Sequence, residues 1–389
     1  ESRWIKQGHS EKSGWPFLVD GPIGREIYLK EILNPVMVDY EILNSKKNGW
    51  NSGSKWIRSM ASMKEIGGYL ELETYEGSLF HDQALALNSG RKCLEYLIQA
   101  KGIKKIHLPR FCCHSVWDEC EKYGVEMIFY NIDQDFLPVF DKDLEEDEWL
   151  YLVNFYGQVS RDKIAEYKKK YPKLIVDNTM AYFQLPVKGV DTLYSCRKFV
   201  GTSDGGFLYT DQTDLYENLK RDQSFDHMGF VLGRFERAAS EFYRESSDNH
   251  ERFTNESLMK MSRLTENLLR PVNYSRIDAN RRNNFAYLHG RLGSKNKLSL
   301  VVPEGPYMYP FYTHYASSLR SALQKEKIYL SLFWSDVFEM CSEDSLEYDY
   351  AQNILPIPVD QRYTTEDMND IVERIEFYLD QFSEEKQPE

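Results

Sequence analysis

Lys198 stands in a context that suits covalent chemistry with a carbonyl group. It lies three residues after Ser195 in the stretch YSCRKFVGTSDGGFLYT, between a predicted strand and a glycine-rich turn. Such turns let the backbone approach a ligand closely. A lysine held there among apolar neighbours has its pKa lowered, so its neutral amine becomes nucleophilic enough to form an imine. The alternative is an ordinary surface lysine, which is the commoner role of this residue type.

Asp177 is the second residue that could serve such chemistry. It ends the apolar segment KLIVD, 21 residues before Lys198. A carboxylate at that place either caps a helix or partners a buried cation, and the cap is the commoner case. In an enzyme that uses pyridoxal 5'-phosphate (PLP), a carboxylate faces the pyridine nitrogen and keeps the ring electron-withdrawing.

The stretch NSGRKCLEYL supplies a third element. Ser89, Gly90 and Arg91 open a predicted helix, and the free N–H groups at a helix start bind phosphate. The alternative is a plain capped helix. A phosphate cradle, a carboxylate and a lysine in this chain order indicate a fold-type I PLP enzyme, with PLP as the cofactor.

Strand and helix patterns alternate around these residues. Helices are predicted in SGRKCLEYLIQAKG, CCHSVWDECEKYG and SRDKIAEYKKKYP, and strands in KKIHLP, VEMIFYNI, EWLYLVNFYG, KLIVD and GVDTLYS. This alternation predicts an α/β fold with a mainly parallel sheet, in which ligands bind outside the carboxyl ends of the strands. Asn154, Asp177 and Ser195 lie at or just past predicted strand ends, so we expect them to converge.

Three regions differ in character. Residues 1–59 hold four of the seven tryptophans and a polar Gly/Ser-rich stretch, and are interpreted as an appended segment of unknown role. Residues 60–290 are expected to form a large PLP-binding α/β domain. Residues 291–389 are expected to form a smaller C-terminal α+β domain, because a short strand and a long helix follow helical, charged sequence.

Composition excludes several classes of protein. A content of 42% apolar residues allows a sizeable core, and a net charge of −13, from 48 basic and 61 acidic residues, disfavours nucleic acid as a partner. No run of 18 apolar residues is present, so no membrane span is expected. The N-terminal stretch lacks the apolar part of a secretory signal, and the six cysteines form no paired zinc motif. We therefore expect a cytoplasmic protein with reduced thiols and no metal site.

Taken together, these residues resemble the DegT/DnrJ/EryC1/StrS family of PLP-dependent sugar aminotransferases, from about residue 66 to residue 380. NFYGQVSRDKIAEYKKKYPKLIVDNTMAYF is similar to the stretch around the family's carboxylate, and SCRKFVGTSDGG resembles its lysine segment. ILPIPVDQRYTTEDMNDIVERI is similar to its C-terminal stretch. The resemblance implies a homodimer with its sites at the interface, and a role in the synthesis of bacterial surface polysaccharides.

The resemblance also implies roles for single residues. Lys198 would form the Schiff base with PLP, and Asp177 would face the pyridine nitrogen. Gly90, Arg91 and Ser195 would hold the phosphate.

Several positions depart from the family pattern. Arg91 replaces a threonine, and Met180 replaces a glutamine. Cys113 stands where the family has an aromatic residue that stacks on the cofactor ring, and Phe111 or His114 could substitute for it.

A further departure concerns the neighbouring subunit. LMKMS resembles the stretch that reaches into the other subunit's site, but Leu258 replaces its asparagine and Lys260 its arginine. The full set of residues expected to contact the cofactor is Ser89, Gly90, Arg91, Phe111, Cys113, Asn154, Asp177, Met180, Ser195 and Lys198.

The leading hypothesis is a PLP-dependent aminotransferase that moves an amino group from a donor, expected to be glutamate, to a keto sugar, expected to be nucleotide-linked. The changed residues around the lysine and carboxylate leave two alternatives open. One is a PLP protein with altered chemistry, such as a sugar dehydratase. The other is a degenerate, non-catalytic protein that binds PLP or a sugar nucleotide as a regulator or assembly subunit.

Overall fold

The computed structural model describes residues 66–140 and 143–384. Contacts divide the chain into two units, residues 1–72 and 73–389. The predicted appended segment, residues 1–59, lies outside the described residues. Everything below concerns the second unit.

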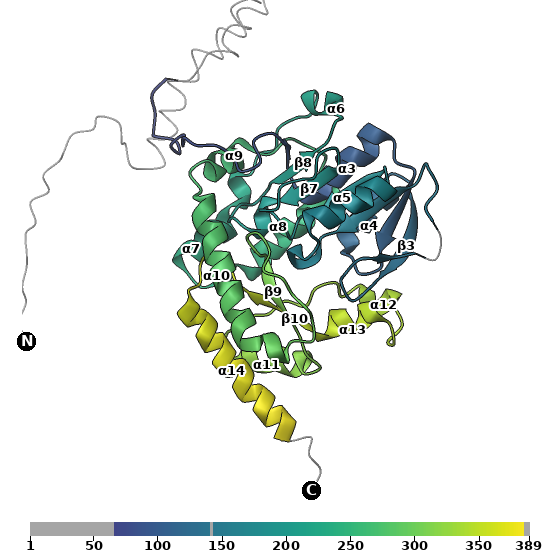
Figure 1. Ribbon diagram of the computed structural model, residues 1–389. Coiled ribbons are helices and arrows are strands. Elements are labelled where there is room, and N and C mark those ends of the chain that lie inside the picture. The colour runs from purple at the N-terminus through teal and green to yellow at the C-terminus, as the bar shows by residue number, and fades with distance from the viewer. Residues whose placement is uncertain (1–65, 141–142, 385–389) are drawn as a thin grey trace, which may run out of the picture. The chain divides into compact units, whose positions relative to one another are not determined.

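A mainly parallel sheet forms the centre of this unit, which confirms the predicted fold class (Figure 1). In the described part of the chain it has eight strands, in the order β1-β8-β7-β6-β5-β2-β3-β4. The inner strands from β7 across to β3 are parallel, and β1, β8 and β4 pair antiparallel at the two edges. Their bounds are β1 Leu85–Leu87, β2 Lys105–Pro109, β3 Glu126–Ile132, β4 Pro138–Val139, β5 Trp149–Val153, β6 Leu174–Asp177, β7 Asp191–Ser195 and β8 Gly206–Tyr209.

The helices between these strands begin and end at clear sequence signals. Helix α3 (Gly90–Lys101) starts after Ser89, whose hydroxyl accepts the Lys92 N–H at 3.2 Å, and ends at Gly102, whose φ is 62°. The next two connecting helices are α4 (His114–Lys122) and α5 (Arg161–Lys170). Strands β5, β6 and β7 are buried along their whole length, as expected for parallel strands covered on both faces.

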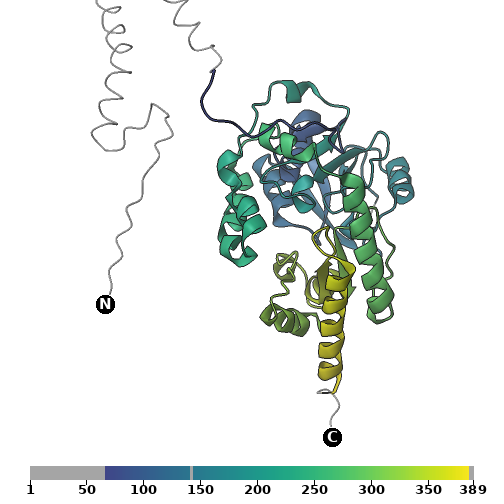
Figure 2. The same ribbon diagram turned by 90° about the vertical axis from the view of Figure 1, so that its left-hand side faces the viewer.

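A second, two-stranded sheet belongs to the C-terminal part of the chain. Strands β9 (Met308–Tyr312) and β10 (Ile354–Pro358) pair antiparallel and pack with the helices α10 (Tyr274–Leu292), α11 (Ala316–Lys325) and α14 (Thr365–Glu384) around a separate apolar core. Figure 2 shows α10 and α14 side by side. The predicted domain boundary at residue 290 falls inside α10, whose last turns belong to this core.

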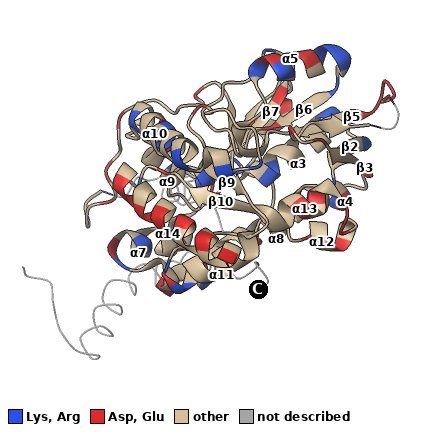
Figure 3. Cartoon of the chain, turned by 60° about the horizontal axis from the view of Figure 1, so that its bottom comes forward, with Lys and Arg blue, Asp and Glu red and all other residues tan. Residues whose placement is uncertain are grey.

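Two partly exposed ion pairs also link α14 to the end of α10. Arg291 of α10 donates to Glu376 at 2.9 Å, and Lys295 just beyond the helix donates to the same carboxylate at 2.7 Å. Figure 3 shows acidic residues (red) along α14 and basic residues (blue) on α10. The remaining described helices are α6 Asp214–Glu217, α7 Gly229–Glu236, α8 Tyr243–Asn255, α9 Arg263–Leu269, α12 Val337–Met340 and α13 Leu346–Asn353. Within the described ranges, no helix combines the length and the apolar character needed to cross a bilayer.

The Asp204-Gly205-Gly206 turn ties β8 to two helix starts. The fully buried carboxylate of Asp204 accepts the backbone N–H and the hydroxyl of Ser262, both at 2.8 Å, and so anchors the start of α9. Gly206 lies against the start of α3, because a Cβ there would come within 2.4 Å of the Ser89 carbonyl carbon. Gly205 adopts a φ of 121°, which a side chain would strain. The glycine-rich turn therefore sets the position of the α3 start.

A buried ion cluster fixes α3 against α4. Lys92 is fully buried, and its ammonium donates to Glu95 at 2.7 Å and to Glu119 of α4 at 2.8 Å. Burial raises the pKa of Glu119 to about 7, while the pKa of Glu95 is lowered by its bonds to Lys92 and Tyr123 against the effect of burial. One carboxylate thus stays charged and the other holds a proton near neutral pH.

This cluster predicts a pH-dependent stability. Because the pKa of Glu119 is raised in the folded chain, its contribution is present below pH 4.5 and is lost as the pH rises to about 7. We expect Glu119→Gln, which mimics the protonated acid, to gain free energy of unfolding relative to the wild type over this range, by about 1 kcal/mol or more. Urea unfolding at a series of pH values measures the difference. Glu126→Gln, at an exposed carboxyl, is the control, and a difference that stays constant with pH would contradict the prediction.

Candidate active site

Most of the predicted residues meet in one cavity at the carboxyl edge of the parallel strands. Its volume is about 430 Å³. The register pairs Val153 of β5 with Asp177 of β6, and Asp177 with Leu193 of β7, so the three strand ends lie side by side. The predicted residues that line the cavity are Ser89, Gly90, Arg91, Cys113, Asp177, Met180, Ser195 and Lys198.

Lys198 faces this cavity from the short turn after β7. Its ammonium donates to the Thr179 hydroxyl at 3.0 Å and lies 5.6 Å from the centre of the Tyr307 ring. Burial lowers the pKa of Lys198, and the Asp177 carboxylate opposes that shift without cancelling it. The reactive neutral form of the amine is therefore more available than in a surface lysine.

Asp177 is buried and held from two sides. One carboxylate oxygen accepts the Tyr151 hydroxyl at 2.8 Å, and the other accepts the Thr179 N–H at 2.8 Å. The second bond forms a local turn of the kind that aspartate commonly makes, and no helix begins there. The bond to Tyr151, a residue of the neighbouring strand, fixes the direction of the carboxylate inside the cavity.

The start of α3 closes one end of the cavity. Lys92 N–H is bound by the Ser89 hydroxyl, which leaves the N–H groups of Gly90 and Arg91 without an intrahelical partner. A Cβ on Gly90 would lie 3.2 Å from the Thr179 methyl carbon and 3.5 Å from the Ser195 Cβ, so the missing side chain keeps this end open. The Arg91 guanidinium donates to the Thr254 hydroxyl.

Two predicted cofactor contacts do not line the cavity. Phe111 is fully buried and packs against the Trp334 ring, with 4.3 Å between ring centres. Asn154 is fully buried too, and its amide donates to Asn178 at 3.0 Å and Gln184 at 2.9 Å. Since side chains alternate along a strand, Asn154 faces away from the cavity that Val153 lines. Neither residue is therefore a direct cofactor contact in the site proposed below, although Phe111 supports Trp334 of the cavity wall.

The positions that depart from the family pattern have varied surroundings. Cys113 is exposed and directly precedes α4, and its sulfur accepts the Ser115 hydroxyl at 3.1 Å. Met180 is buried at the cavity wall. Leu258 belongs to the main apolar core, and the Lys260 ammonium lies 4.5 Å from the centre of the Tyr216 ring.

Several residues that line the cavity were not predicted from the sequence. Thr179 is the one that a local pattern could have indicated, because a residue two positions after a strand-end aspartate commonly donates its N–H to that aspartate. No local motif predicted the aromatic wall of Tyr307, Phe333 and Trp334, which comes from the C-terminal part of the chain. The other lining residues not predicted include Tyr151, Arg197, His250 and Phe253.

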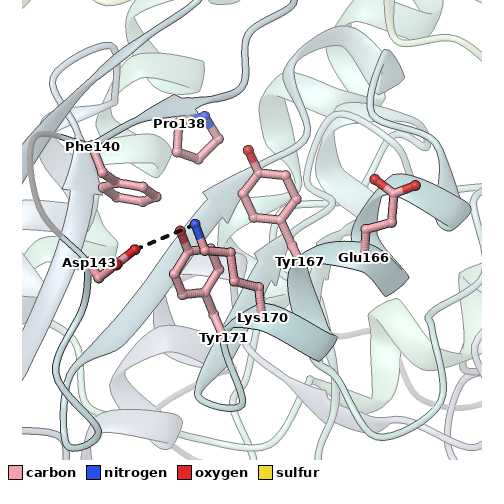
Figure 4. A pocket seen from close by; sticks show the side chains of 7 residues that line it. All are labelled: Pro138, Phe140, Asp143, Glu166, Tyr167, Lys170 and Tyr171. Atoms are coloured by element: carbon pink, nitrogen blue, oxygen red, sulfur yellow. Dashed lines mark ion pairs between the residues drawn. The ribbon is translucent and has the colours of Figure 1, made fainter.

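Another cavity lacks comparable chemistry. It measures about 520 Å³ and is lined by Phe140, Tyr167, Tyr171 and charged residues (Figure 4). Its lysine, Lys170, pairs with Asp143 at 3.6 Å. The pKa of Lys170 is raised by its hydrogen bond to Tyr171, so this amine is held in the charged, unreactive form. No cluster of three or more metal-ligating side chains occurs among residues 66–140 and 143–384.

The site predicts how the Lys198 amine responds to its neighbour. Because Asp177 raises the pKa of Lys198, Asp177→Asn should lower it further and move the midpoint of amine labelling to lower pH. Reductive methylation followed by mass spectrometry of the peptide containing Lys198 measures this shift, with the exposed Lys188 as internal reference. Asp214→Asn should leave the midpoint unchanged. An upward shift in Asp177→Asn would contradict the assigned electrostatics.

The sequence matches no protein-family model and no curated protein, whereas the fold has many counterparts among solved structures. DesV from S. venezuelae, solved with a ketimine intermediate, has a TM-score of 0.55 at 16% identity over 88% of this chain and 96% of its own. A DegT DnrJ EryC1 StrS aminotransferase from Brucella abortus has a TM-score of 0.52 at 13% identity, over 91% of this chain and 97% of its own. The PLP form of Spr1654 from Streptococcus pneumoniae has a TM-score of 0.52 at 12% identity, over 75% of this chain and 85% of its own. The chain thus has the fold of the DegT/DnrJ/EryC1/StrS-type aminotransferases.

Proposed function

We propose that this chain is a PLP-dependent aminotransferase that transfers an amino group from an amino-acid donor to a keto sugar. The donor is expected to be glutamate and the sugar to be nucleotide-linked. The observation that carries the proposal is the pairing of Lys198, whose pKa is lowered, with the buried and doubly held Asp177 in one cavity at the carboxyl edge of the sheet.

The residues present fit PLP. The cavity offers an amine in Lys198, a carboxylate in Asp177, and an anion-binding end at the start of α3, where a Gly90 side chain would fill the cradle. Solved proteins of the same fold support the choice of cofactor, since Spr1654 has a PLP form and a pyridoxamine phosphate form, and DesV holds a ketimine intermediate.

PLP, when bound, supplies an aldehyde that takes up an amino group and a ring that withdraws electrons from the adjoining carbon. Lys198 supplies the amine that holds the aldehyde. Its Nζ, once released, would act as general base and then general acid for the proton of the donor carbon, and burial favours this role because it lowers the pKa of the amine. Asp177, held by Tyr151 and Thr179, keeps a proton on the ring nitrogen.

The aromatic wall has a separate task. Tyr307 and Phe333 stack with 6.2 Å between ring centres, and Trp334 lies next to them with a positive φ of 55°. A bulky residue in this backbone region is held there only by its surroundings, here the rings of Phe111 and Phe155. The wall covers the cavity and reduces the access of water to the reacting groups.

The proposal predicts a specific covalent attachment. Purified protein incubated with PLP should show visible cofactor absorbance, and borohydride should fix the cofactor to Lys198 in peptide mass spectra. Lys198→Ala should abolish the fixation, whereas Lys188→Ala, at an exposed lysine, should not affect it. Absence of both signals in the wild-type protein would exclude all the PLP hypotheses.

Addition of glutamate separates the aminotransferase from its alternatives. An aminotransferase should convert the bound cofactor to its pyridoxamine form and release 2-oxoglutarate. Bound PLP that glutamate never converts would instead favour a dehydratase or a non-catalytic binding protein. These two alternatives are retained because Cys113 and Met180 replace the aromatic residue and the glutamine of the family pattern.

We also propose that the chain forms a homodimer. Its support is a set of exposed apolar side chains over α7 and the neighbouring segments, which includes Phe225, Leu232, Phe235 and Tyr243. Phe235 is 92% exposed, and large apolar groups gathered in this way are typical of interaction surfaces.

This surface gives a test of the assembly. Phe235→Glu should convert the dimer to a monomer in light scattering, because it places a charge in a desolvated contact. Phe377→Glu, at an exposed phenylalanine of α14, should leave the dimer intact. A wild-type monomer would refute the homodimer, and a dimeric Phe235→Glu protein would place the interface elsewhere.

A further inference from the structure

Arg197 is a cation of the cavity without a protein anion to match it. It lies between Ser195 and Lys198 in the chain, and its guanidinium makes no hydrogen bond or ion pair with any residue that the structure describes. Its Nε is buried and has no partner. An unpaired buried charge is costly, so a site that retains one indicates a missing counter-charge.

The described charged residues near Arg197 do not supply a partner for its guanidinium. Arg91 has Asp118 at 3.8 Å, and Arg252 has Glu256 at 2.8 Å and Asp222 at 3.3 Å, so each of these two arginines is paired with acid. His250 also faces the cavity, and its pKa is lowered by burial and by the neighbouring arginines. Burial lowers the pKa of Arg197 to about 10; the cations Arg252 and Arg91 add to this shift, and the Asp204 carboxylate, which is bonded to Ser262 instead, opposes it. Of these three arginines, Arg197 is therefore the one without a carboxylate bound to it among the described residues.

The geometry leaves the guanidinium free to bind a ligand. Its carbon lies 4.7 Å from the centre of the Phe253 ring, and the opposing cation Arg252 lies 4.3 Å from the same centre. A planar guanidinium supported by an aromatic ring keeps its edge N–H groups available for an oxyanion. Those groups share the cavity with the Ser195 hydroxyl and with the unpaired N–H groups of Gly90 and Arg91.

This donor set suits a phosphate monoester better than a carboxylate. A helix start, a hydroxyl and an unpaired guanidinium offer donors from several directions, and phosphate presents three oxygens and close to two negative charges at neutral pH. A carboxylate has two oxygens in one plane and a single charge. All the donors come from one chain.

We propose that Arg197 is the residue that binds the phosphate group of the cofactor, together with the start of α3 and the Ser195 hydroxyl. This inference rests on the proposed function for the identity of the ligand. The site itself recognises a phosphate monoester, whether it belongs to PLP or to another molecule.

The test compares PLP with pyridoxal, which has the same aldehyde and ring but no phosphate. Dissociation constants are measured from cofactor absorbance for the wild type, Arg197→Gln and Arg244→Gln, the last at an exposed arginine of α8. Loss of the charged hydrogen bonds should weaken PLP binding by about 10-fold to 100-fold in Arg197→Gln. Pyridoxal binding should not change, and Arg244→Gln should match the wild type in both. If the ratio of the dissociation constants for pyridoxal and PLP is the same in Arg197→Gln as in the wild type, the proposal is wrong.

Inorganic phosphate distinguishes this inference from the proposed function. It should raise the melting temperature of cofactor-free wild-type protein and not that of Arg197→Gln. If neither aldehyde attaches to Lys198 while phosphate still stabilises the protein through Arg197, the aminotransferase proposal fails and the phosphate site stands. If phosphate has the same effect on both proteins, the site is refuted.

A second variant, Arg197→Lys, tests the proposal if Arg197→Gln does not fold. Arg197→Lys keeps the charge but loses the planar fork that rests on Phe253. PLP affinity in Arg197→Lys should fall between those of the wild type and a protein without the charge, and pyridoxal affinity should stay at the wild-type value. If Arg197→Lys binds PLP as tightly as the wild type, the planar guanidinium is not required for phosphate binding and that part of the proposal is wrong.

Discussion

The placement of the Lys198 amine in a cavity with Asp177 is the interaction on which the rest of this structure depends. Removing an ammonium from water favours its neutral form, and a nearby carboxylate favours the charged form. Here burial is the larger effect, so the amine keeps a lowered pKa even with Asp177 close. That balance requires the carboxylate to be held at a defined place, and Tyr151 and Thr179 hold it. The burial of Lys198 and Asp177 in one cavity thus accounts both for the lowered pKa of the amine and for the fixed position of the carboxylate.

The turn at residues 204–206 extends this arrangement to the other end of the cavity. Gly206 allows β8 to lie against the start of α3, and Asp204 secures the start of α9 from inside the protein. The cluster centred on Lys92 then fixes α3 against α4. Because these contacts are buried and polar, they hold only one geometry well.

Much of the fold was predictable because its signals are local. Ser89 and Gly102 mark the two ends of α3 through their own backbone preferences, and the apolar runs of β5, β6 and β7 are typical of buried parallel strands. The order of these elements implied a parallel sheet and a site at its carboxyl edge. Most of the expected cofactor contacts line the cavity for this reason. Asn154 does not, since the strand pattern located its backbone but not the direction of its side chain.

The sequence by itself determined the type of fold and the chemical groups available, because helix caps, strand runs and the lysine segment depend on neighbouring residues. Tertiary structure alone decided how those groups act. It decided that, among the described residues, Arg197 has no carboxylate bound to it while Arg91 has one and Arg252 has two, and that Tyr307, Phe333 and Trp334 line the same cavity as the lysine. Some of these contacts, such as that of Lys198 with the Tyr307 ring, join residues more than a hundred positions apart. A short stretch of sequence cannot predict such contacts, because they form only when distant parts of the chain pack together.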